Sequence, residues 1–409
     1  MVLNGADYIN VNNLIITGTG ATYALSCHLW NQADNNTFTN CTFNAPATGT
    51  VTTLSPFSIS GSATTATAAG ISGNNNILNS CTANGGYYGI ALTGQSVAIP
   101  ATGNQVLNCN IKEFYLYGMY NATQNGAINS GCVIERPTRT DVSTFYGIYV
   151  SSCINHMADK NRIRKSFSGN TASTSTNYGI YITGDASIGN ENKFINNLIS
   201  EMNGNGTLYG IYSTGADYWQ AYHNTISLDF AAATTTSLTN GIYSSGTLAY
   251  DVRNNMITIS RGGAATNKHC LYFTTPGIAT CNYNNLFINA PGTTNVGYNG
   301  ASYASLAAWQ GASGYDANSV SANPSYISPA TGNYRPSSSS VDNICVGLGI
   351  LDDITNILRS AIDPDPGAYE FSLSPKMPEQ QHCLHLVRQV VIPMLKLFQL
   401  KLETMEQQY

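Results

Sequence analysis

The chain has 409 residues and a formal net charge of −5, and only 10% of its residues are charged. Lysine and arginine do not cluster, so the chain lacks the basic surface that phosphate neutralisation requires. No apolar run approaches the roughly 18 residues that a membrane-spanning helix needs. We therefore expect neither a nucleic-acid partner nor a membrane span. Glycine, asparagine, serine, threonine and tyrosine dominate the composition, whereas an average globular chain has about 25% charged residues.

A repeat of about 30 residues runs from the N-terminus to about residue 290. One column of the repeat holds an asparagine or a cysteine, followed two residues later by a mostly apolar residue. Its members are Asn13, Cys41, Cys81, Cys109, Cys132, Asn161, Asn197, Asn224, Asn255 and Asn285. A second column reads Tyr-Gly-Ile-Tyr in its clearest copies, and its glycine lies 14 residues before the first column, as from Gly118 to Cys132. This fixed offset indicates a repeated structural unit.

Short β-prone runs with almost no helical pattern predict a solenoid in which each repeat is one coil of parallel strands. In Gly179–Ile182 the alternation predicts isoleucines inside, and glycine and tyrosine outside. Asparagine tolerates the left-handed conformation of a sharp bend, and its amide can bond to the like amide one coil away. We expect the cysteines to be mostly free and buried. Neighbouring coils leave a Cys81–Cys109 or Cys109–Cys132 bridge open.

With these columns the chain resembles the right-handed parallel β-helices of the pectate-lyase-like superfamily, which carry an asparagine ladder at one corner. The resemblance covers residues 1–290 and implies an all-β, right-handed, single-stranded parallel β-helix of about ten coils. It also implies that the Tyr-Gly-Ile-Tyr run is the first strand of each coil, and that the second and third strands flank the asparagine column. The variable connections from third to first strands would form loops on one side.

Both ends of the sequence depart from the repeat. Residues Met1 to Asn13 enter a coil directly, without the segments of a signal peptide. We expect a leader and a cap to be missing, and an extracellular or cell-surface location. Residues 291–371 resemble the closing segment of secreted β-helix proteins of Bacteroidetes-type bacteria, through Trp309, Gly314–Ser319 and the motif Gly367–Phe371. This segment is predicted to cap the β-helix.

The acidic residues of the closing segment and the last 38 residues carry weaker signals. Asp316, Asp363 and Asp365 leave calcium binding open, but turn formation is the favoured interpretation because their spacing is irregular. Residues 372–409 change abruptly to a leucine-rich composition without glycine, which predicts an atypical tail, helical or disordered. Its His382, Cys383 and His385 are too few to predict a metal site. We predict no metal or other cofactor, and a monomer.

The resemblance implies that catalytic acids would lie on the outer face of the first strand. Glycoside hydrolysis needs two carboxyl groups about 5 to 10 Å apart, yet this column contains none. It reads Ala91, Tyr120, Tyr149, Tyr181, Tyr212, Tyr243 and Tyr272. Tyrosine offers apolar area with a polar tip, which suits sugars. The stacked tyrosines, with Trp219 as a further stacking residue, predict a glycan-binding or adhesin-type module; alternatively, they only cover a solenoid face.

An enzyme is the less favoured alternative. Glu135, Arg136, Arg164 and Lys165 flank consecutive coils, which suggests a polysaccharide lyase or glycoside hydrolase acting on an acidic polysaccharide between the loops beside the first strand. A looser cluster of candidate catalytic residues comprises Asp185, Asp217 and His223. Such a site would need acidic and basic groups that converge within hydrogen-bond reach.

Overall fold

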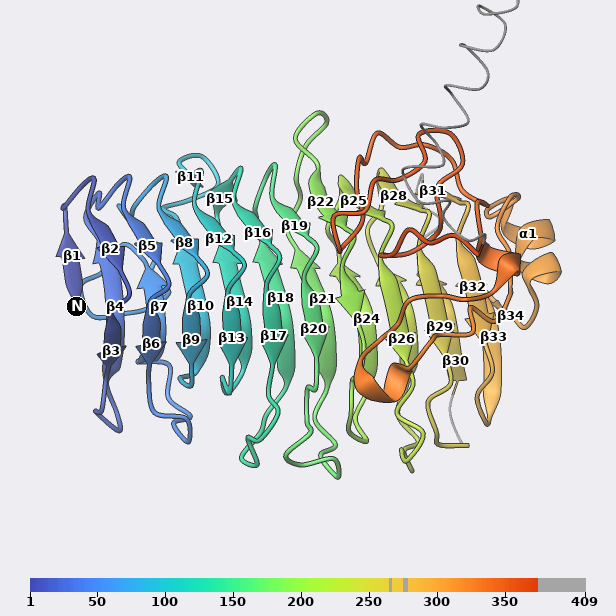
Figure 1. The fold of residues 1–409 in the computed structure, drawn as a ribbon, viewed down its shortest axis with the longest axis horizontal. Coiled ribbons are helices and arrows are strands. Elements are labelled where there is room, and N and C mark those ends of the chain that lie inside the picture. Colours follow the sequence, from blue (N-terminus) through green and yellow to red (C-terminus); the bar gives the residue numbers. More distant parts are fainter. Residues whose placement is uncertain (265–266, 275–278, 374–409) are drawn as a thin grey trace, which may run out of the picture. The chain divides into compact units, whose positions relative to one another are not determined.

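The computed structural model describes residues 1–264, 267–274 and 279–373. The predicted tail and its histidines therefore lie outside the described residues, apart from residues 372–373. Residues Met1–Phe371 form one compact unit. Three parallel sheets run along its long axis, and each coil adds one strand to each sheet (Figure 1). The second and third sheets have ten strands each, so the predicted all-β parallel solenoid of about ten coils is confirmed.

The first sheet contains the longest strands. They are β1 (Val2–Asn4), β4 (Ala24–Trp30), β7 (Leu54–Ile59), β10 (Tyr88–Thr93), β14 (Tyr117–Ala122), β18 (Phe145–Ser151), β21 (Asn177–Thr183), β24 (Leu208–Thr214), β27 (Thr239–Ser244), β30 (Asn267–Phe273), β33 (Thr293–Asn299) and β34 (Ser302–Tyr303). Only β34 pairs in the antiparallel sense within this described sheet, against β33.

The other two sheets meet at a sharp corner. The second sheet comprises β2 (Asn10–Asn12), β5 (Thr37–Thr39), β8 (Ile77–Asn79), β12 (Gln105–Leu107), β16 (Ile128–Ser130), β19 (Met157–Asp159), β22 (Asn192–Ile195), β25 (Trp219–Tyr222), β28 (Tyr250–Arg253) and β31 (Ala279–Asn282). The third comprises β3 (Ile15–Thr17), β6 (Thr42–Asn44), β9 (Thr82–Asn84), β13 (Asn110–Lys112), β17 (Val133–Glu135), β20 (Arg162–Arg164), β23 (Leu198–Ile199), β26 (Thr225–Leu228), β29 (Met256–Ile259) and β32 (Asn285–Ile288). A separate two-stranded parallel sheet pairs β11 (Ala101–Thr102) with β15 (Gln124–Asn125), and these strands come just before β12 and β16 in the chain.

The interior consists of aliphatic side chains that occupy the same place in successive coils. Ile148, Ile180, Ile211 and Ile242 are in register on the first sheet and are fully buried. Burying such a side chain stabilises the fold by about 1.5–3 kcal/mol. Because each coil contributes only a few of them, the core becomes continuous only through stacking.

An asparagine ladder closes the corner between the second and third sheets. Asn161, Asn197, Asn224, Asn255 and Asn284 are fully buried. Each side-chain amide donates to the next side-chain oxygen, at 2.9, 3.0, 3.0 and 3.1 Å. The column continues through four cysteines, and the Cys132 amide donates to the Asn161 side chain at 3.0 Å. The predicted corner column is therefore confirmed over most of its length.

Two details of that prediction are wrong. The column begins at Leu14 and ends at Asn284, one residue away from the predicted Asn13 and Asn285. The left-handed residue is the one before each ladder position, as at Asn196 with φ 55° and Asn254 with φ 59°. Bending and amide stacking are thus performed by adjacent residues. In sequence, an asparagine at either position looks the same.

The cysteines behave as expected. The nine that fall within the described residues are all buried and free. Burial raises the pKa of the Cys153 thiol to about 12, which makes a thiolate unfavourable in the interior. The bridges left open for Cys81, Cys109 and Cys132 are not formed.

A second ladder, not recognised in the sequence, closes the corner between the first and second sheets. The Asn36 side chain donates to Asn76 at 3.0 Å, Asn76 donates to Asn104 at 3.3 Å, and Asn104 donates to Gln124 at 3.1 Å. His156 follows later at this corner, where its backbone amide donates to the Asn192 side chain at 3.0 Å. The His156 ring is fully buried, and neither of its nitrogens has a partner among the described residues.

Replacing His156 with leucine is expected to flatten the acid side of the pH–stability curve. Burial lowers the pKa of His156 to about 3, below its unfolded value of about 6.5. The unfolded chain therefore binds a proton that the folded protein does not, and stability falls as the pH drops below about 6.5, by up to about 1.4 kcal/mol per unit. Urea unfolding at about pH 6.5 and pH 5 should show that the parent loses roughly 2 kcal/mol more than the variant. Parallel curves for the two proteins would contradict this assignment.

The last coil is closed by helix α1 (Leu306–Ser313), which lies at the β33 end of the solenoid (Figure 1). Its Trp309 is fully buried, and its indole nitrogen donates to the Asp316 carboxylate at 2.8 Å. The same carboxylate accepts the side-chain amide of Asn284 at 2.9 Å. Asp316 thus terminates the asparagine ladder.

Beyond α1 the chain turns back as a segment that we call the C-terminal strap, residues 323–371, which lies across the middle and C-terminal coils (Figure 1). It includes two short 3-10 helices, η1 (Pro329–Thr331) and η2 (Ser339–Val341). Leu198 packs with strap residues Tyr334 and Tyr369, and Met256 packs with Phe371. The strap therefore covers apolar residues on the outer face of the third sheet.

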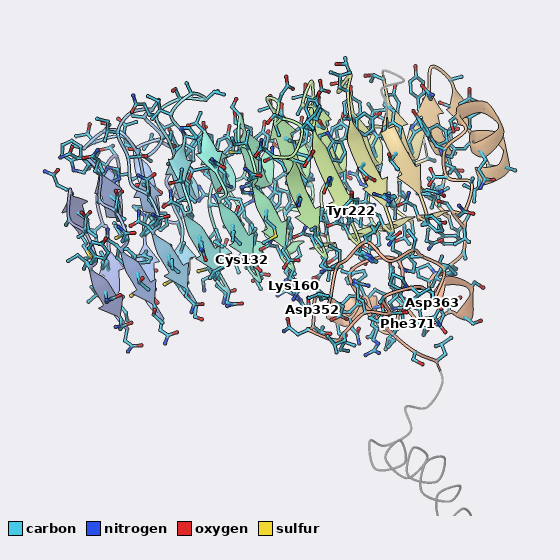
Figure 2. All side chains as sticks on the ribbon, turned by 90° about the horizontal axis from the view of Figure 1, so that it is seen from above. Cys132, Lys160, Tyr222, Asp352, Asp363 and Phe371 are labelled. Carbon is cyan, nitrogen blue, oxygen red and sulfur yellow. The ribbon has the colours of Figure 1, made fainter. Side chains whose placement is uncertain are left out.

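Four left-handed corner residues hold the strap: Lys160, Asn196, His223 and Asn254. Their respective strap partners are the Asp352 carboxylate at 2.8 Å, the Arg359 guanidinium at 2.8 Å, the Asp365 carbonyl at 3.0 Å and the Val346 carbonyl at 2.7 Å. Figure 2 shows Lys160 and Asp352 next to each other at the margin of the strap. The residues that bend the corner thus also anchor the returning chain.

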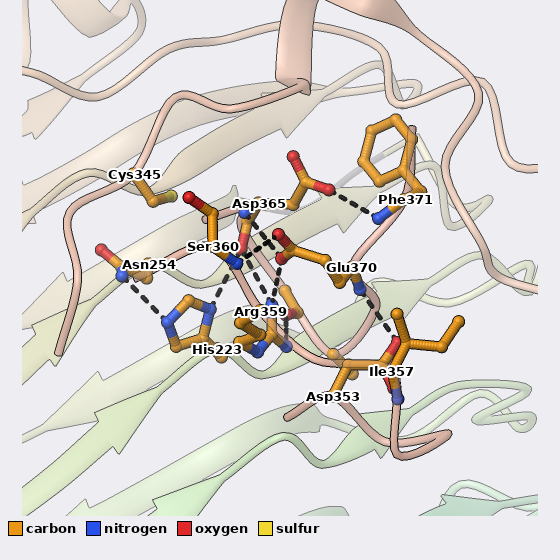
Figure 3. A network of polar contacts seen from close by, with 12 residues as sticks. His223, Asn254, Cys345, Asp353, Ile357, Arg359, Ser360, Asp365, Glu370 and Phe371 are labelled. Atoms are coloured by element: carbon orange, nitrogen blue, oxygen red, sulfur yellow. Dashed lines mark hydrogen bonds and ion pairs between the residues drawn. The ribbon is translucent and has the colours of Figure 1, made fainter. Parts of the chain in front are cut away.

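A buried polar network joins residues of the strap to one another and to the corner residues His223 and Asn254 (Figure 3). The fully buried Arg359 side chain pairs with Glu370 at 3.1 Å and also donates to the Gly367 carbonyl at 2.8 Å. Glu370 in turn accepts the backbone amides of Ser360 and Asp365 at 2.9 and 3.0 Å. Because buried charges are costly without partners, this network fixes how the strap lies on the corner.

Candidate functional site

Two rows of tyrosines cover the outer face of the first sheet, and together we call them the tyrosine face. The first row is Tyr88, Tyr117, Tyr146, Tyr178 and Tyr209. The second row is Tyr120, Tyr149, Tyr181, Tyr212, Tyr243, Tyr272 and Tyr298. Sequence analysis identified the second row except Tyr298, which lies where the repeat fades. Gly297, the residue before Tyr298, is the sequence feature that could have identified this tyrosine as a member of the row.

Both rows face outward because two residues between them face inward. In strand β24, Gly210 and Ile211 are buried while Tyr209 and Tyr212 are partly exposed. A Cβ atom at Gly210 would lie 2.5 Å from Ile226 Cγ2 and 2.6 Å from the Gly241 carbonyl oxygen. The glycine column therefore allows coils to pack closely. The prediction that glycine shares the outer face with tyrosine is wrong, because the strand does not keep a strict two-residue alternation here.

The ring faces of the tyrosines meet each other along each row. In the second row, Tyr212 and Tyr243 have centroids 4.6 Å apart and planes within 10°, and Tyr272 and Tyr298 are 4.1 Å apart within 2°. The first row stacks similarly, with Tyr178 and Tyr209 at 5.3 Å and 4°. Rings of different rows meet edge to face. Neighbouring rings thus occupy the ring faces that we expected to receive sugars, which leaves ring edges and hydroxyls toward solvent.

The tyrosine face is uncharged at neutral pH. Burial raises the pKa of Tyr120, Tyr181 and Tyr209 to about 12. The first row continues as Asn240, His269 and Asn295, and burial lowers the pKa of His269 to about 4. The face therefore presents hydroxyl groups that both donate and accept hydrogen bonds, without a carboxylate or a cation in either row.

Arg136 is not available to a substrate, contrary to its selection as a candidate catalytic residue. Its side chain is fully buried and lies over the rings of Phe114, Phe145 and Phe167, at 5.6, 4.9 and 4.6 Å from their centroids. The guanidinium donates to backbone carbonyls, including that of Ser166 at 2.8 Å. Burial lowers its pKa well below the usual value. Arg136 is a structural cation that closes a connection between coils.

The other members of this candidate set belong to the third sheet or its edge: Glu135 ends β17, Arg164 ends β20, and Lys165 directly follows β20. Arg164 forms ion pairs with Glu135 at 2.9 Å and with Glu201 at 3.7 Å. Lys165 is a left-handed residue with φ 51°, and its backbone amide donates to the Glu201 carbonyl at 3.0 Å. The structure brings Glu135 and Arg164 together, but as partners of each other. Their catalytic role remains a prediction.

The acidic residues of the looser candidate cluster form hydrogen bonds with backbone amides of the fold. Asp185 accepts the backbone amide of Asp217 at 3.0 Å, and Asp217 accepts those of Thr247 and Leu248 at 2.7 and 2.8 Å. Both carboxylates thus bond to loop amides of the next coil. The selection of their cluster partner His223 as a catalytic residue is contradicted by its position under the strap.

Two aromatic or basic candidates are fully buried. His223 donates to the Asp365 carbonyl and accepts from the Asn254 side chain at 3.0 Å (Figure 3). Burial lowers its pKa well below the ordinary value. Trp219 stacks on Tyr250 at 5.3 Å and donates to the Ala216 carbonyl at 3.1 Å. Contrary to the predictions, His223 is inaccessible to substrate and Trp219 offers no face to a sugar.

Within the part of the chain that the structure describes, no three histidine, cysteine or acidic side chains gather in a way that could hold a metal ion. In the same described part, no helix combines the length and apolar character needed to cross a membrane. Comparison with models of known protein families gives no match, and comparison with curated proteins gives none.

Proposed function

We propose that this chain is an extracellular or cell-surface β-solenoid module, related to the pectate-lyase-like superfamily, that binds a neutral polysaccharide along its tyrosine face. The observation that carries the proposal is the second tyrosine row, which repeats on every first-sheet strand from β14 to β33. Neighbouring hydroxyls recur at about the 4.8 Å spacing of paired strands. An extended sugar chain lying along the axis could bond to several of them.

The lack of charged residues in the two tyrosine rows favours a neutral polysaccharide over an acidic one. Neither row contains a cation that would attract an acidic polymer, and neutral hydroxyls pair well with sugar hydroxyls. A lyase or hydrolase acting on acidic polysaccharides is a weaker proposal, because Arg136 is buried and Arg164 is already paired with two carboxylates. A binding or adhesin-type role needs no converging catalytic groups.

Removing two hydroxyls from the middle of the second row, with Tyr181→Phe and Tyr212→Phe together, is expected to weaken binding by roughly tenfold or more. Each lost hydrogen bond is worth about 0.5–1.5 kcal/mol, and about 1.4 kcal/mol is tenfold in affinity. The phenylalanines keep the ring stacking, so the fold should be retained. Affinity electrophoresis in gels that contain neutral polysaccharides would measure the change, with uronic-acid polymers for comparison.

The matched control is Tyr8→Phe, which removes the same group from a side chain that is 75% exposed and lies outside both rows. It should bind like the parent. Loss of affinity in the double variant alone would support the proposal. If the parent retards on no neutral polysaccharide, or if the double variant binds unchanged, the tyrosines serve only to cover the solenoid face.

A further inference from the structure

A groove separates the C-terminal strap from the loops that follow β23 and β26. It has a volume of about 440 Å³ and is lined by Glu201, Asn203, Asp229, Phe230, Pro329 and Tyr334, among others. A hollow of about 210 Å³ adjoins it and shares Asp229, Ser260 and Pro329 with it. Asp229 therefore lies where the two meet. This groove is on the third sheet, so it is separate from the tyrosine face.

Asp229 is held in place by one of its two carboxylate oxygens. Its Oδ2 accepts the Tyr334 hydroxyl at 2.7 Å and the Ser227 hydroxyl at 3.3 Å. Among the described residues, no lysine or arginine forms an ion pair with Asp229. Burial raises the pKa of this carboxyl above its ordinary value. A positively charged partner would offset the cost of keeping Asp229 ionised.

The surroundings of Asp229 add negative charge. Glu201 lies in the same groove, and its ion pair with Arg164 is long, at 3.7 Å, because that guanidinium is also bound by Glu135 at 2.9 Å. Lys165 is the second nearby cation that acts on Glu201. The charged groups that act on one another here are therefore three carboxylates, Glu135, Glu201 and Asp229, and two cations, Arg164 and Lys165. Charge complementarity favours a ligand that carries one additional positive charge.

The uncharged lining favours a sugar as the carrier of that charge. Phe230 and Pro329 offer apolar surface, which suits the C–H face of a sugar ring. Asn203 and Ser260 offer an amide and a hydroxyl for sugar hydroxyls. We propose that this groove binds an amino sugar within an oligosaccharide, with the ammonium group on Asp229. This inference goes beyond the proposed function and does not depend on the tyrosine face.

Isothermal titration of the whole chain with a β-linked glucosamine hexamer, below the pKa of the sugar amine, tests the proposal. The fully N-acetylated hexamer has the same backbone without the charge, and should bind at least tenfold more weakly. Asp229→Asn keeps an oxygen for the Tyr334 and Ser227 hydroxyls and should lose at least tenfold in affinity for the glucosamine hexamer. Asp141→Asn removes the same charge from an exposed residue near an earlier coil, and should bind like the parent.

Each outcome of these titrations either supports or overturns the proposed amino-sugar site. Equal binding of the two hexamers, no binding of the glucosamine hexamer, or unchanged affinity of the folded Asp229→Asn variant overturns the proposal. So does tighter binding of a trilysine peptide, which would make the groove a peptide site. If Asp229→Asn fails to fold, the comparison of charged and acetylated hexamers on the parent still decides. Loss of affinity in Asp229→Asn but not in the tyrosine variants separates this groove from the tyrosine face.

Discussion

Replacing Arg359 with methionine is expected to destabilise the protein by about 3–5 kcal/mol, because it removes one partner of a buried ion pair. The Arg359 side chain is fully buried and pairs with Glu370 at 3.1 Å. It also donates to the Asn196 side chain and to the Gly367 carbonyl, both at 2.8 Å. Methionine fills a similar volume but makes none of these bonds. Urea unfolding at neutral pH would measure the loss.

The comparison variant is Arg164→Met, which breaks two ion pairs at a partly exposed position. Such pairs are worth about 0–1 kcal/mol, so its effect should be small. We also expect limited proteolysis to cleave the strap of Arg359→Met before the solenoid, because the strap depends on this network for its attachment. A loss below about 1 kcal/mol for Arg359→Met would show that apolar packing alone holds the strap.

The interior could be predicted from the sequence because stacking makes each residue meet its counterpart in the next coil. Asparagines or cysteines that recur at the same position of the repeat are therefore stacked in one line along the solenoid axis. The errors at Asn13 and Asn285 occur where an asparagine stands next to the column position. A bend and a stacked amide favour the same residue type, so the sequence pattern cannot separate them.

The tyrosine face could be predicted only in part. A strict alternation accounts for Tyr181 but would place Tyr178, three residues earlier, inside. Only the close packing of Gly179, whose Cβ would lie 2.5 Å from the Gly210 carbonyl oxygen, shows why both tyrosines face outward. The burial of candidate site residues could not be predicted from the sequence either. Arg136 is as polar in sequence as any surface arginine, and the aromatic rings around it come from three separate segments of the chain.

The sequence also contains a signal of the strap, at an outward position of the third sheet. The outward position that begins the third strand is polar in most early coils, as at Thr42, Asn110 and Arg162. In later coils it reads Leu198, Thr225, Met256 and Asn285, and its two apolar members, Leu198 and Met256, are buried against the strap. Apolar residues at an outward solenoid position indicate that another segment covers that face.

Replacing Asn224 with leucine is expected to destabilise the protein by about 3 kcal/mol or more. Asn224 Oδ1 accepts the backbone and side-chain amides of Asn197, both at 3.0 Å. Its Nδ2 donates to the Phe194 carbonyl at 2.8 Å and to Asn255 Oδ1 at 3.0 Å. Leucine leaves the Asn197 amide and the Phe194 carbonyl without these partners in the interior, and each such group costs about 1–3 kcal/mol. Urea unfolding would measure the effect.

The same substitution at Asn129 is the matched control. Asn129 is equally buried, but it lies on the second sheet between Val106 and Ala158, and neither polar atom of its side chain has a partner among the described residues. Leucine there removes no such bond, so a change within about 1 kcal/mol in either direction is expected. Similar losses at the two positions would mean that volume, rather than the amide ladder, determines stability. A large loss at Asn224 alone would show that hydrogen bonding between coils holds the stack together at this corner.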